Sequence, residues 1–315
     1  MVTAQRLMLL DTASLYFRAF FGVPDSVRAP DGTPVNAVRG LLDFISRLVE
    51  EYQPTHLVCC WDNDWRPQWR VDLIPSYKQH RVVAVRPGDV PDIEEVPDPL
   101  EAQIPVIIEV LTAFGICIVG ADRFEADDVI GTLATDAGMP VDIVTGDRDL
   151  FQLVDDTSEV RVLYTARGVG RHERVTEHTV VEKYSVLPQQ YADFATLRGD
   201  ASDGLPGVAG VGDKTAASLL LSYGDLSGIR AAAADPGSAL GPGPRGRIIA
   251  ASDYLDVAPT VVALARDIDL GTPDSQLPRV PSNPDALVEL ARRWGLNSPV
   301  ERLTAVLASS DSGRT

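Results

Sequence analysis

The chain has 315 residues, of which 45% are hydrophobic and 23% are charged, and its formal net charge is −17. This length is enough to bury one large core or two modest ones, and no apolar stretch is long enough to span a membrane. A charge this negative argues against binding nucleic acid through a globally positive surface, so such binding would depend on local basic patches and bound cations.

Short apolar segments rich in β-branched residues alternate with helical patterns over the first 165 residues. This alternation predicts an α/β fold, with a parallel central sheet that is flanked by helices on both faces. The predicted strands are Leu7–Leu10, Leu57–Trp61, Ile116–Val119, Val141–Thr145 and Val160–Thr165, and the predicted helices between them include Val35–Glu51, with Pro34 at its first position, Pro105–Phe114 and Ala126–Ala137.

Two stretches interrupt this pattern. The segment Val82–Gln103 has four prolines and six acidic residues but one arginine, which predicts a mobile insertion. The segment Ala231–Gly246 is rich in Ala, Gly and Pro and predicts a surface loop. Strand patterns disappear from about Val186 onward, so we expect a core over residues 1–185, a helical region over 186–308 and a disordered tail over 309–315.

Nine carboxylates lie where strand-like segments give way to loops or helices. Because the carboxyl ends of parallel strands meet at one edge of a sheet, we expect these side chains to converge there. Like charges at short range repel, so a cluster of this kind requires cations, and hard divalent ions prefer oxygen ligands. The pattern therefore predicts a Mg²⁺ or Mn²⁺ site for phosphoryl transfer, formed by Asp11, Asp62, Glu125, Asp127, Asp128, Asp147, Asp149, Asp200 and Asp203.

Each acidic motif also has a purely structural explanation. The acids of Glu125-Ala-Asp-Asp128 could cap the helix that begins there, because helix N-termini favour negative charge. The pair Asp147 and Asp149 could form a turn at a strand end. It is the joint occurrence of all nine that favours a metal site.

A glycine-rich stretch, Gly204–Leu221, precedes an amphipathic helical pattern. Its glycines expose backbone N–H groups that can approach a phosphate, and Lys214 follows in the first helical turn. The order Gly-Val-Gly-Asp-Lys-Thr-Ala fits a hairpin between two helices that grips a nucleic-acid backbone without reading bases. It lacks the four-residue gap of a nucleotide-binding P-loop.

Taken in order, these motifs resemble the bacterial 5′ nuclease family, which includes the flap endonucleases and the 5′-nuclease domain of DNA polymerase I. The resemblance covers about residues 6–270. It implies a PIN-like α/β core, a helical arch over the active site at about residues 75–105, and a helix–three-turn–helix element at 203–222. The motifs that carry it are Asp11…Arg18-Ala-Phe20, Trp61-Asp62, Tyr77-Lys78…Arg81, Glu125-Ala-Asp-Asp128, Thr145-Gly-Asp-Arg-Asp149, Gly199-Asp200…Asp203-Gly-Leu-Pro-Gly207 and Gly210-Val-Gly-Asp-Lys-Thr-Ala216.

Roles follow from the resemblance position by position. The nine carboxylates match acidic positions that hold metal directly or through water, and Lys78 and Arg81 match basic residues that engage the scissile phosphate. Phe17 matches an aromatic position that stacks on the terminal base, and the hairpin clasps duplex DNA, often through a bound K⁺. The expected DNA contacts are Phe17, Arg18, Tyr77, Gly207, Gly210, Gly212, Lys214 and Thr215.

The resemblance implies a metal-dependent 5′-3′ exonuclease and flap endonuclease that cuts 5′ flaps, 5′ ends, nicks and gaps in DNA or RNA–DNA hybrids during primer removal and repair. We expect a stand-alone, monomeric, cytoplasmic and nucleoid-associated protein, since the chain has no room for a polymerase domain and its three cysteines indicate reduced, buried thiols. No convincing sliding-clamp peptide is present in the tail.

Three other functions were weighed. A non-catalytic DNA-junction binder of the same fold is disfavoured by the complete set of acidic residues. An aspartate-nucleophile phosphatase could use Asp147-Arg-Asp149, but that motif lies in the middle of the chain. An RNA-specific PIN ribonuclease is disfavoured because such proteins generally lack the hairpin.

Overall fold

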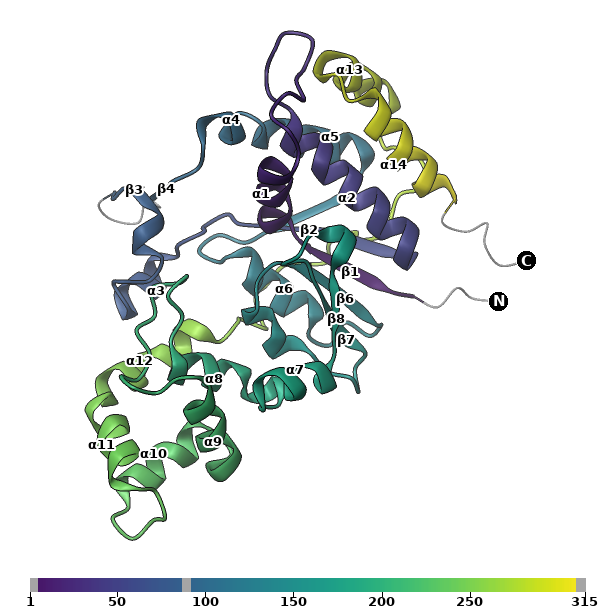
Figure 1. Cartoon of the computed structure of the whole chain (residues 1–315). Coiled ribbons are helices and arrows are strands. Elements are labelled where there is room, and N and C mark those ends of the chain that lie inside the picture. Colours follow the sequence, from purple (N-terminus) through teal and green to yellow (C-terminus); the bar gives the residue numbers. More distant parts are fainter. Residues whose placement is uncertain (1–4, 87–91, 310–315) are drawn as a thin grey trace.

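A six-stranded sheet lies at the centre of the N-terminal part of the molecule, seen in a computed structural model that describes residues 5–86 and 92–309 (Figure 1). The spatial order of the strands is β5-β2-β1-β6-β7-β8. The first five are parallel and correspond to the predicted strands, which confirms the α/β fold. No sequence pattern indicates β8, which has three residues, two of them charged, and is antiparallel to β7. The strands are β1 (Leu7–Asp11), β2 (His56–Trp61), β5 (Cys117–Gly120), β6 (Val141–Thr145), β7 (Val160–Tyr164) and β8 (Glu173–Val175).

Side chains of the central strands alternate between two hydrophobic clusters. In β1, Leu7 and Leu9 belong to one cluster, whereas Met8 and Leu10 belong to the other. Successive side chains of a strand point to opposite faces, so a strand that is apolar at every position needs cover on both sides. The near-continuous apolar runs in the sequence therefore require helices on both faces of the sheet.

Five helices cover the face that carries Met8 and Leu10. They come from both ends of the chain: α13 packs on α5, and α14 packs on α2 (Figure 1). The last two helices therefore belong spatially to the core and not to the helical region in which the sequence places them. Their bounds are α1 (Thr12–Gly22), α2 (Asn36–Tyr52), α5 (Ile104–Phe114), α13 (Pro284–Trp294) and α14 (Asn297–Ser309), so Pro34 lies just before α2 and not in its first turn.

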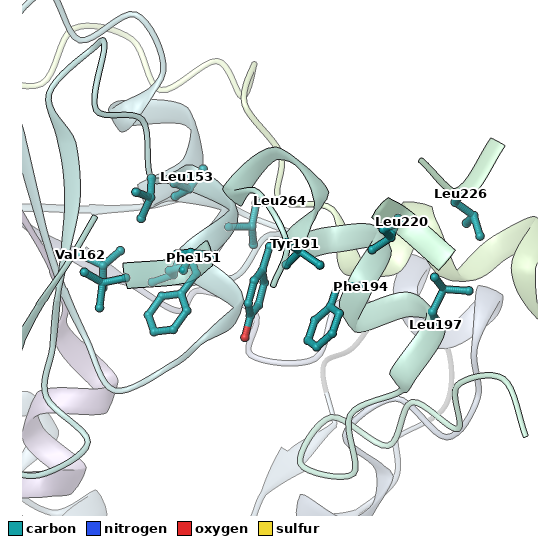
Figure 2. Packing of buried hydrophobic residues seen from close by; sticks show 14 of the residues in the cluster. Phe151, Leu153, Val162, Tyr191, Phe194, Leu197, Leu220, Leu226 and Leu264 are labelled. Carbon is teal, nitrogen blue, oxygen red and sulfur yellow. The ribbon is translucent and has the colours of Figure 1, made fainter. Parts of the chain in front are cut away.

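The opposite face continues directly into the helical region. Phe151, which follows β6, packs against Tyr191, and Tyr191 packs against Phe194, with ring centroids 5.5 Å and 5.7 Å apart (Figure 2). The same cluster reaches Leu220 and Leu226, so the helical region shares its core with the sheet. The elements of this face and of the helical region are α6 (Ala126–Ala134), η2 (Asp149–Leu153), α7 (Glu177–Tyr184), η4 (Pro188–Gln190), α8 (Tyr191–Arg198), α9 (Asp213–Tyr223), α10 (Leu226–Ala234), α11 (Pro242–Ala250) and α12 (Ser252–Val262). The short η3 (Val169–Arg171) instead contributes Val169 to the cluster of Met8 and Leu10.

The predicted surface loop Ala231–Gly246 is largely helical. Helix α10 runs to Ala234 and α11 begins at Pro242, which leaves residues 235–241 as the connection. Two physical effects explain the error: alanine is the strongest helix former, and proline is favoured in a first helical turn. Both effects depend on the position of each residue, so the overall composition of the segment does not reveal them.

The acidic insertion is more ordered than predicted. It follows α3 (Gln68–Leu73) and η1 (Gln79–Arg81) and contains β3 (Val82–Ala84), β4 (Ile93–Glu94) and α4 (Asp98–Glu101). Arg66 pairs with Asp92, and the Trp65 ring nitrogen donates to the Asp92 carbonyl at 3.1 Å. The described part is thus a β-ribbon with one short helix and not a long helical arch, as expected for a proline-rich segment with β-branched residues. The predicted mobility of residues 87–91 lies outside the described residues.

Within the described ranges, no helix combines the length and the apolar character that crossing a bilayer would require.

Candidate active site

Three carboxylates lie at the carboxyl edge of the sheet, as the strand pattern predicts. Asp11 ends β1, while Asp62 and Asp147 follow β2 and β6 closely. Because β1 lies between β2 and β6 in the sheet, the three side chains reach the same edge. Residues that are 51, 85 and 136 positions apart in the sequence are therefore close in space.

Local hydrogen bonds fix the orientation of these acids. Asp11 accepts from the Ser14 N–H at 3.1 Å, which caps α1, and from the Thr145 hydroxyl at 2.7 Å. Asp62 accepts from the N–H of Ala126 at 2.7 Å, so it lies at the positive N-terminus of α6. Two carboxylates are thus held at helix starts, and their remaining acceptor positions are available to other partners.

The acids at this edge repel one another. Burial and the charges of Asp62 and Asp147 together raise the pKa of Asp11 to about 7, against hydrogen bonds from Thr145 and Ser14 that lower it. Burial also raises the pKa of Asp127, together with the charges of Asp11 and Asp147. The pKa of Asp62 is raised, mainly by burial. A raised pKa means that the ionised form lacks a compensating positive charge, which a bound cation would supply.

A second acidic group lies beside Asp147. Burial raises the pKa of Asp149, followed by the charge of Asp147, and burial raises the pKa of Asp203 to about 6. Asp200 differs: although burial opposes ionisation, hydrogen bonds from Ser202 and the charge of Arg198 lower its pKa. Asp200 thus has its own partners, whereas Asp149 and Asp203 add negative charge to the edge.

A buried arginine that the sequence analysis missed holds the acids of α6. The Arg70 side chain is 2% exposed and donates to Glu125 at 2.8 Å and to both oxygens of Asp128, at 2.7 and 2.8 Å. Asp128 also accepts from the N–H groups of Glu125 and Ala265. Four donors saturate the lone pairs of one carboxylate, so this structure leaves Asp128 no position for a metal ion. Its predicted role as a ligand is corrected to a structural one.

Tyr77 and Lys78 complete the surroundings of Glu125. The Tyr77 hydroxyl donates to Glu125 at 2.7 Å, and the Lys78 ammonium pairs with the other oxygen. Tyr77 is 4% exposed, which contradicts its predicted contact with DNA. The charges of Lys78 and Arg70 outweigh the effect of burial and lower the pKa of Glu125. Glu125 is therefore, like Asp128, neutralised from within the protein.

The base of the insertion contacts the loop that carries Asp203. The Lys78 N–H donates to the Asp203 carbonyl at 2.9 Å. The Arg81 guanidinium donates to the Ser202 carbonyl at 2.8 Å and to the Asp203 carboxylate at 3.2 Å. Gly204 lies so close to the Ser76 carbonyl that an added Cβ would approach it to 2.0 Å. The two predicted basic residues are thus brought to the acidic edge.

A cavity of about 1170 Å³ opens at this edge. Its lining includes Glu94, an acid of the insertion that the sequence analysis did not select. Burial raises the pKa of Glu94 to about 7, with the charge of Asp62 as the next cause. Of the predicted residues, the cavity is lined by Asp11, Phe17, Arg18, Asp62, Lys78, Arg81, Glu125, Asp127 and Asp147.

The predicted hairpin lies outside the cavity, in the helical region. Gly207 and Gly210 have positive φ values of 66° and 75°, which residues other than glycine rarely adopt, and Gly212 caps α9. Lys214 is exposed in the first turn of α9, with Thr215 beside it. The hairpin therefore forms at the predicted place, and its exposed lysine stands apart from the acidic edge.

An all-oxygen donor set with raised pKa values suits hard divalent cations. Among the described residues, however, no three acidic, histidine or cysteine side chains already form a compact metal site. Mutual repulsion and the pairing of Glu125 and Asp128 with protein cations account for this spread.

Comparisons with known proteins agree with the sequence motifs. Residues 6–185 match the 5′-3′ exonuclease N-terminal resolvase-like domain, and residues 186–285 match the 5′-3′ exonuclease C-terminal SAM fold. A 5′-3′ exonuclease of Streptomyces coelicolor is 60% identical, over 96% of this chain and all of its own length. A 5′-3′ exonuclease of Mycobacterium tuberculosis is 50% identical, over 96% of this chain and 97% of its own.

Solved structures share the fold at low sequence identity. The bacteriophage T5 D15 flap endonuclease, solved in complex with DNA and metal ions, matches 97% of this chain and 99% of its own, with a TM-score of 0.63 and 16% identity. The family matches and the full-length relatives identify the protein: the chain belongs to the 5′-3′ exonuclease family.

Proposed function

We propose that this protein hydrolyses phosphodiester bonds at the 5′ ends of DNA and at junctions between single and double strands, with Mg²⁺ or Mn²⁺ as cofactor. The observation that carries the proposal is the composition of the cavity. Unneutralised carboxylates line one side of it, while Lys78, Arg81 and the aromatic ring of Phe17 line other parts. A phosphate, its counter-cations and a base would each find a matching group there.

The acidic side chains divide into two sets around Asp147. Asp11, Asp62 and Asp127 would hold one ion, and Asp149 and Asp203, with Asp147 shared between the sets, would hold another. Bound divalent ions supply a water molecule of lowered pKa and stabilise charge on the leaving oxygen. The carboxylates fix where these ions bind, because Asp11 and Asp62 are themselves held by backbone donors.

The remaining residues would orient the DNA. Lys78 and Arg81 line the cavity beside the acids and would contact the scissile phosphate. Phe17 would stack on the terminal base, a contact that any base can make. Lys214 and the N–H groups around Gly210 and Gly212 would grip the duplex backbone, with K⁺ as a possible ligand of the hairpin.

This arrangement fits substrates that present a duplex to the hairpin and a 5′ strand to the cavity: flaps, nicks, gaps and RNA–DNA hybrids, as arise in primer removal and repair. The T5 flap endonuclease that shares the fold was solved with DNA, which supports DNA as the ligand of this chain.

A product map tests the proposal. A flap substrate labelled at its 5′ end is incubated with the protein in Mg²⁺, in Mn²⁺ and in EDTA, beside an Asp127→Asn variant. We expect short 5′ products or release of the flap at the junction, in both metals, and none in EDTA or with the variant. Digestion from the 3′ end, or cleavage that persists in EDTA, would contradict the proposal.

A further inference from the structure

The chain leaves the helical region through a short stretch, residues 261–266, which we call the crossing segment. It begins with the last two residues of α12 and lies against both elements that bear the acids: α6, with Glu125 and Asp128, and η2, which begins at Asp149. Gly131 of α6 allows this approach, because a Cβ there would meet the Ala265 carbonyl at 2.5 Å.

Arg70 joins the crossing segment to the acids of α6. Its Nε donates to the Val261 carbonyl at 3.2 Å, while its two terminal nitrogens bind Glu125 and Asp128. The crossing segment also binds Asp128 directly, through the N–H of Ala265 at 3.0 Å. A guanidinium presents its donors in one rigid plane, so it can hold three partners at once, whereas a lysine ammonium cannot reproduce that fork.

Gln152 makes the equivalent connection to the second acidic group. Its amide nitrogen donates to the Asp149 carbonyl at 2.9 Å and to the Val262 carbonyl at 3.2 Å. Its amide oxygen accepts from the Leu264 N–H at 3.1 Å. Every contact of this side chain thus runs either to the crossing segment or to the backbone of Asp149.

Neither side chain lines the cavity, so neither is placed to touch a substrate. Both are buried, and the contacts they make fix the backbone or the carboxylates of the acidic edge. Residues that orient metal ligands from behind commonly change metal affinity or activity by about 10- to 100-fold when they are replaced.

We propose that Arg70 and Gln152 are positioning residues: with the crossing segment, they hold α6, which carries Asp127, and η2, which begins at Asp149, at the spacing that the metal ions require. This inference rests on the proposed metal-dependent nuclease function. The helical region then has two roles, because it binds duplex through the hairpin and, through the crossing segment, also supports the acidic edge. Loss of either side chain should reduce metal affinity and turnover while duplex binding persists.

The test compares Arg70→Lys, which retains the charge but loses the fork, with Gln152→Met, which retains much of the volume but loses the amide. Mn²⁺ affinity of the metal-free protein is measured by calorimetry, and kcat and KM are measured on a flap substrate. We expect Mn²⁺ affinity about 10-fold weaker and kcat about 10- to 100-fold lower, with KM changed by less than about 2-fold.

Arg161→Lys is the matched control. Arg161 pairs with the buried Asp142 at 2.6 Å, and Asp142 lies near the opposite end of β6 from Asp147. The same substitution there weakens a comparable ion pair without touching the acidic edge, so Mn²⁺ affinity and kcat should match the wild type. An equal loss in Arg161→Lys would show a general effect of stability and would overturn the inference.

A double-variant cycle adds a second readout. If Arg70 acts through Asp128, the double variant Arg70→Lys/Asp128→Asn should lose less Mn²⁺ binding free energy than the sum of the losses in the two single variants. Unchanged Mn²⁺ affinity in folded Arg70→Lys and Gln152→Met, or strictly additive losses in the cycle, would refute the inference. The two proposals can fail independently. If both variants bound Mn²⁺ more weakly but the wild-type protein cut no flap, the positioning role would be supported and the nuclease function rejected.

Discussion

The acidic edge, where the carboxylates lie at the carboxyl ends of the strands, and the hairpin are stabilised in different ways. At the acidic edge, carboxylates that repel one another are held together by a packed core, backbone donors and the buried cations Arg70 and Lys78. At the hairpin, the shape is set by the backbone itself, with glycines at positive φ and a single exposed lysine, Lys214. The first region concentrates charge, while the second presents backbone N–H groups.

This difference predicts how each region responds to substitution. A change at the acidic edge alters the electrostatics of a buried site, so it should act mainly on turnover. A change at the hairpin removes a contact that is equal in the ground state and the transition state, so it should act mainly on affinity. The predictions below either sharpen this division or break it.

The largest effect is expected at Asp149. Asp149→Ala removes a carboxylate that we propose as a metal ligand and leaves every cation of the site in place. Flap cleavage should therefore fall by at least about 10³-fold, because metal ions supply several kcal/mol of transition-state stabilisation. Binding of the flap, measured by fluorescence anisotropy in Ca²⁺, should remain within about 3-fold of the wild type. Asp155→Ala, six residues further along at an exposed turn, is the control and should cleave normally.

If Asp149→Ala lost binding and cleavage together, the division between the two regions would fail at its clearest point. A circular dichroism spectrum and a melting curve distinguish that outcome from misfolding.

Lys78 should show the next largest effect. In Lys78→Ala, kcat should fall by about 100-fold with little change in KM, since we propose that the ammonium binds the reacting phosphate. The variant also leaves Glu125 with Arg70 as its remaining cation, which should lower the melting temperature. Lys183→Ala is the control, because Lys183 also pairs with a glutamate but is exposed on α7. A loss confined to KM would assign Lys78 to substrate binding instead.

The sequence analysis located the acidic edge because its signal is local. Each acid follows a strand, and parallel strands bring their carboxyl ends to one edge, so Asp11, Asp62 and Asp147 could be placed together before the fold was known. The hairpin was equally local, since its glycines and its helix start are adjacent in the sequence.

The pairing within the site could not be predicted in this way. Arg70 lies 55 and 58 residues from the acids it binds, and nothing in its neighbourhood distinguishes it from a surface arginine. Asp128 was therefore assigned to the metal, and Tyr77 to DNA, although both face buried partners. Glu94 was missed for the same reason: an acidic, proline-rich insertion indicates solvated charge, yet β4 directs this acid to the cavity.

A smaller effect is expected at Lys214. In Lys214→Ala, affinity for duplex-containing substrates should fall several-fold regardless of sequence, and the slope of log affinity against log salt should decrease by about 0.9, the value for one phosphate contact. At saturating substrate, kcat should stay at the wild-type value. Arg230→Ala, on α10 of the same helical region, removes a half-buried cation that pairs with Asp256 and should leave the slope unchanged. Equal slopes in all three proteins would contradict the role of the hairpin.

The smallest effect concerns stability without metal. Burial and mutual repulsion raise the pKa of Asp11 to about 7, of Glu94 to about 7 and of Asp203 to about 6. A carboxyl whose pKa is higher in the folded state than in the unfolded state stabilises the fold fully below its unfolded value, near pH 4. This contribution disappears as pH rises through the folded pKa. The melting temperature of the metal-free protein should therefore fall by several degrees between pH 5 and pH 8, at about 2 °C for each kcal/mol.

Two comparisons isolate the cause of that fall. Glu125 and Asp200 have lowered pKa values, so their stabilising contributions vanish below about pH 4 and do not offset the trend between pH 5 and pH 8. Asp11→Asn removes one carboxyl whose pKa is raised and should flatten the profile of melting temperature against pH. Mg²⁺ should raise the melting temperature more at pH 8 than at pH 5, because it binds the ionised carboxylates. Lys214 lies in the first turn of α9, apart from the acidic edge, so Lys214→Ala should follow the wild-type profile. A melting temperature that rises from pH 5 to pH 8 without metal would show that these acids are already neutralised within the protein, and the contrast between the two regions would disappear.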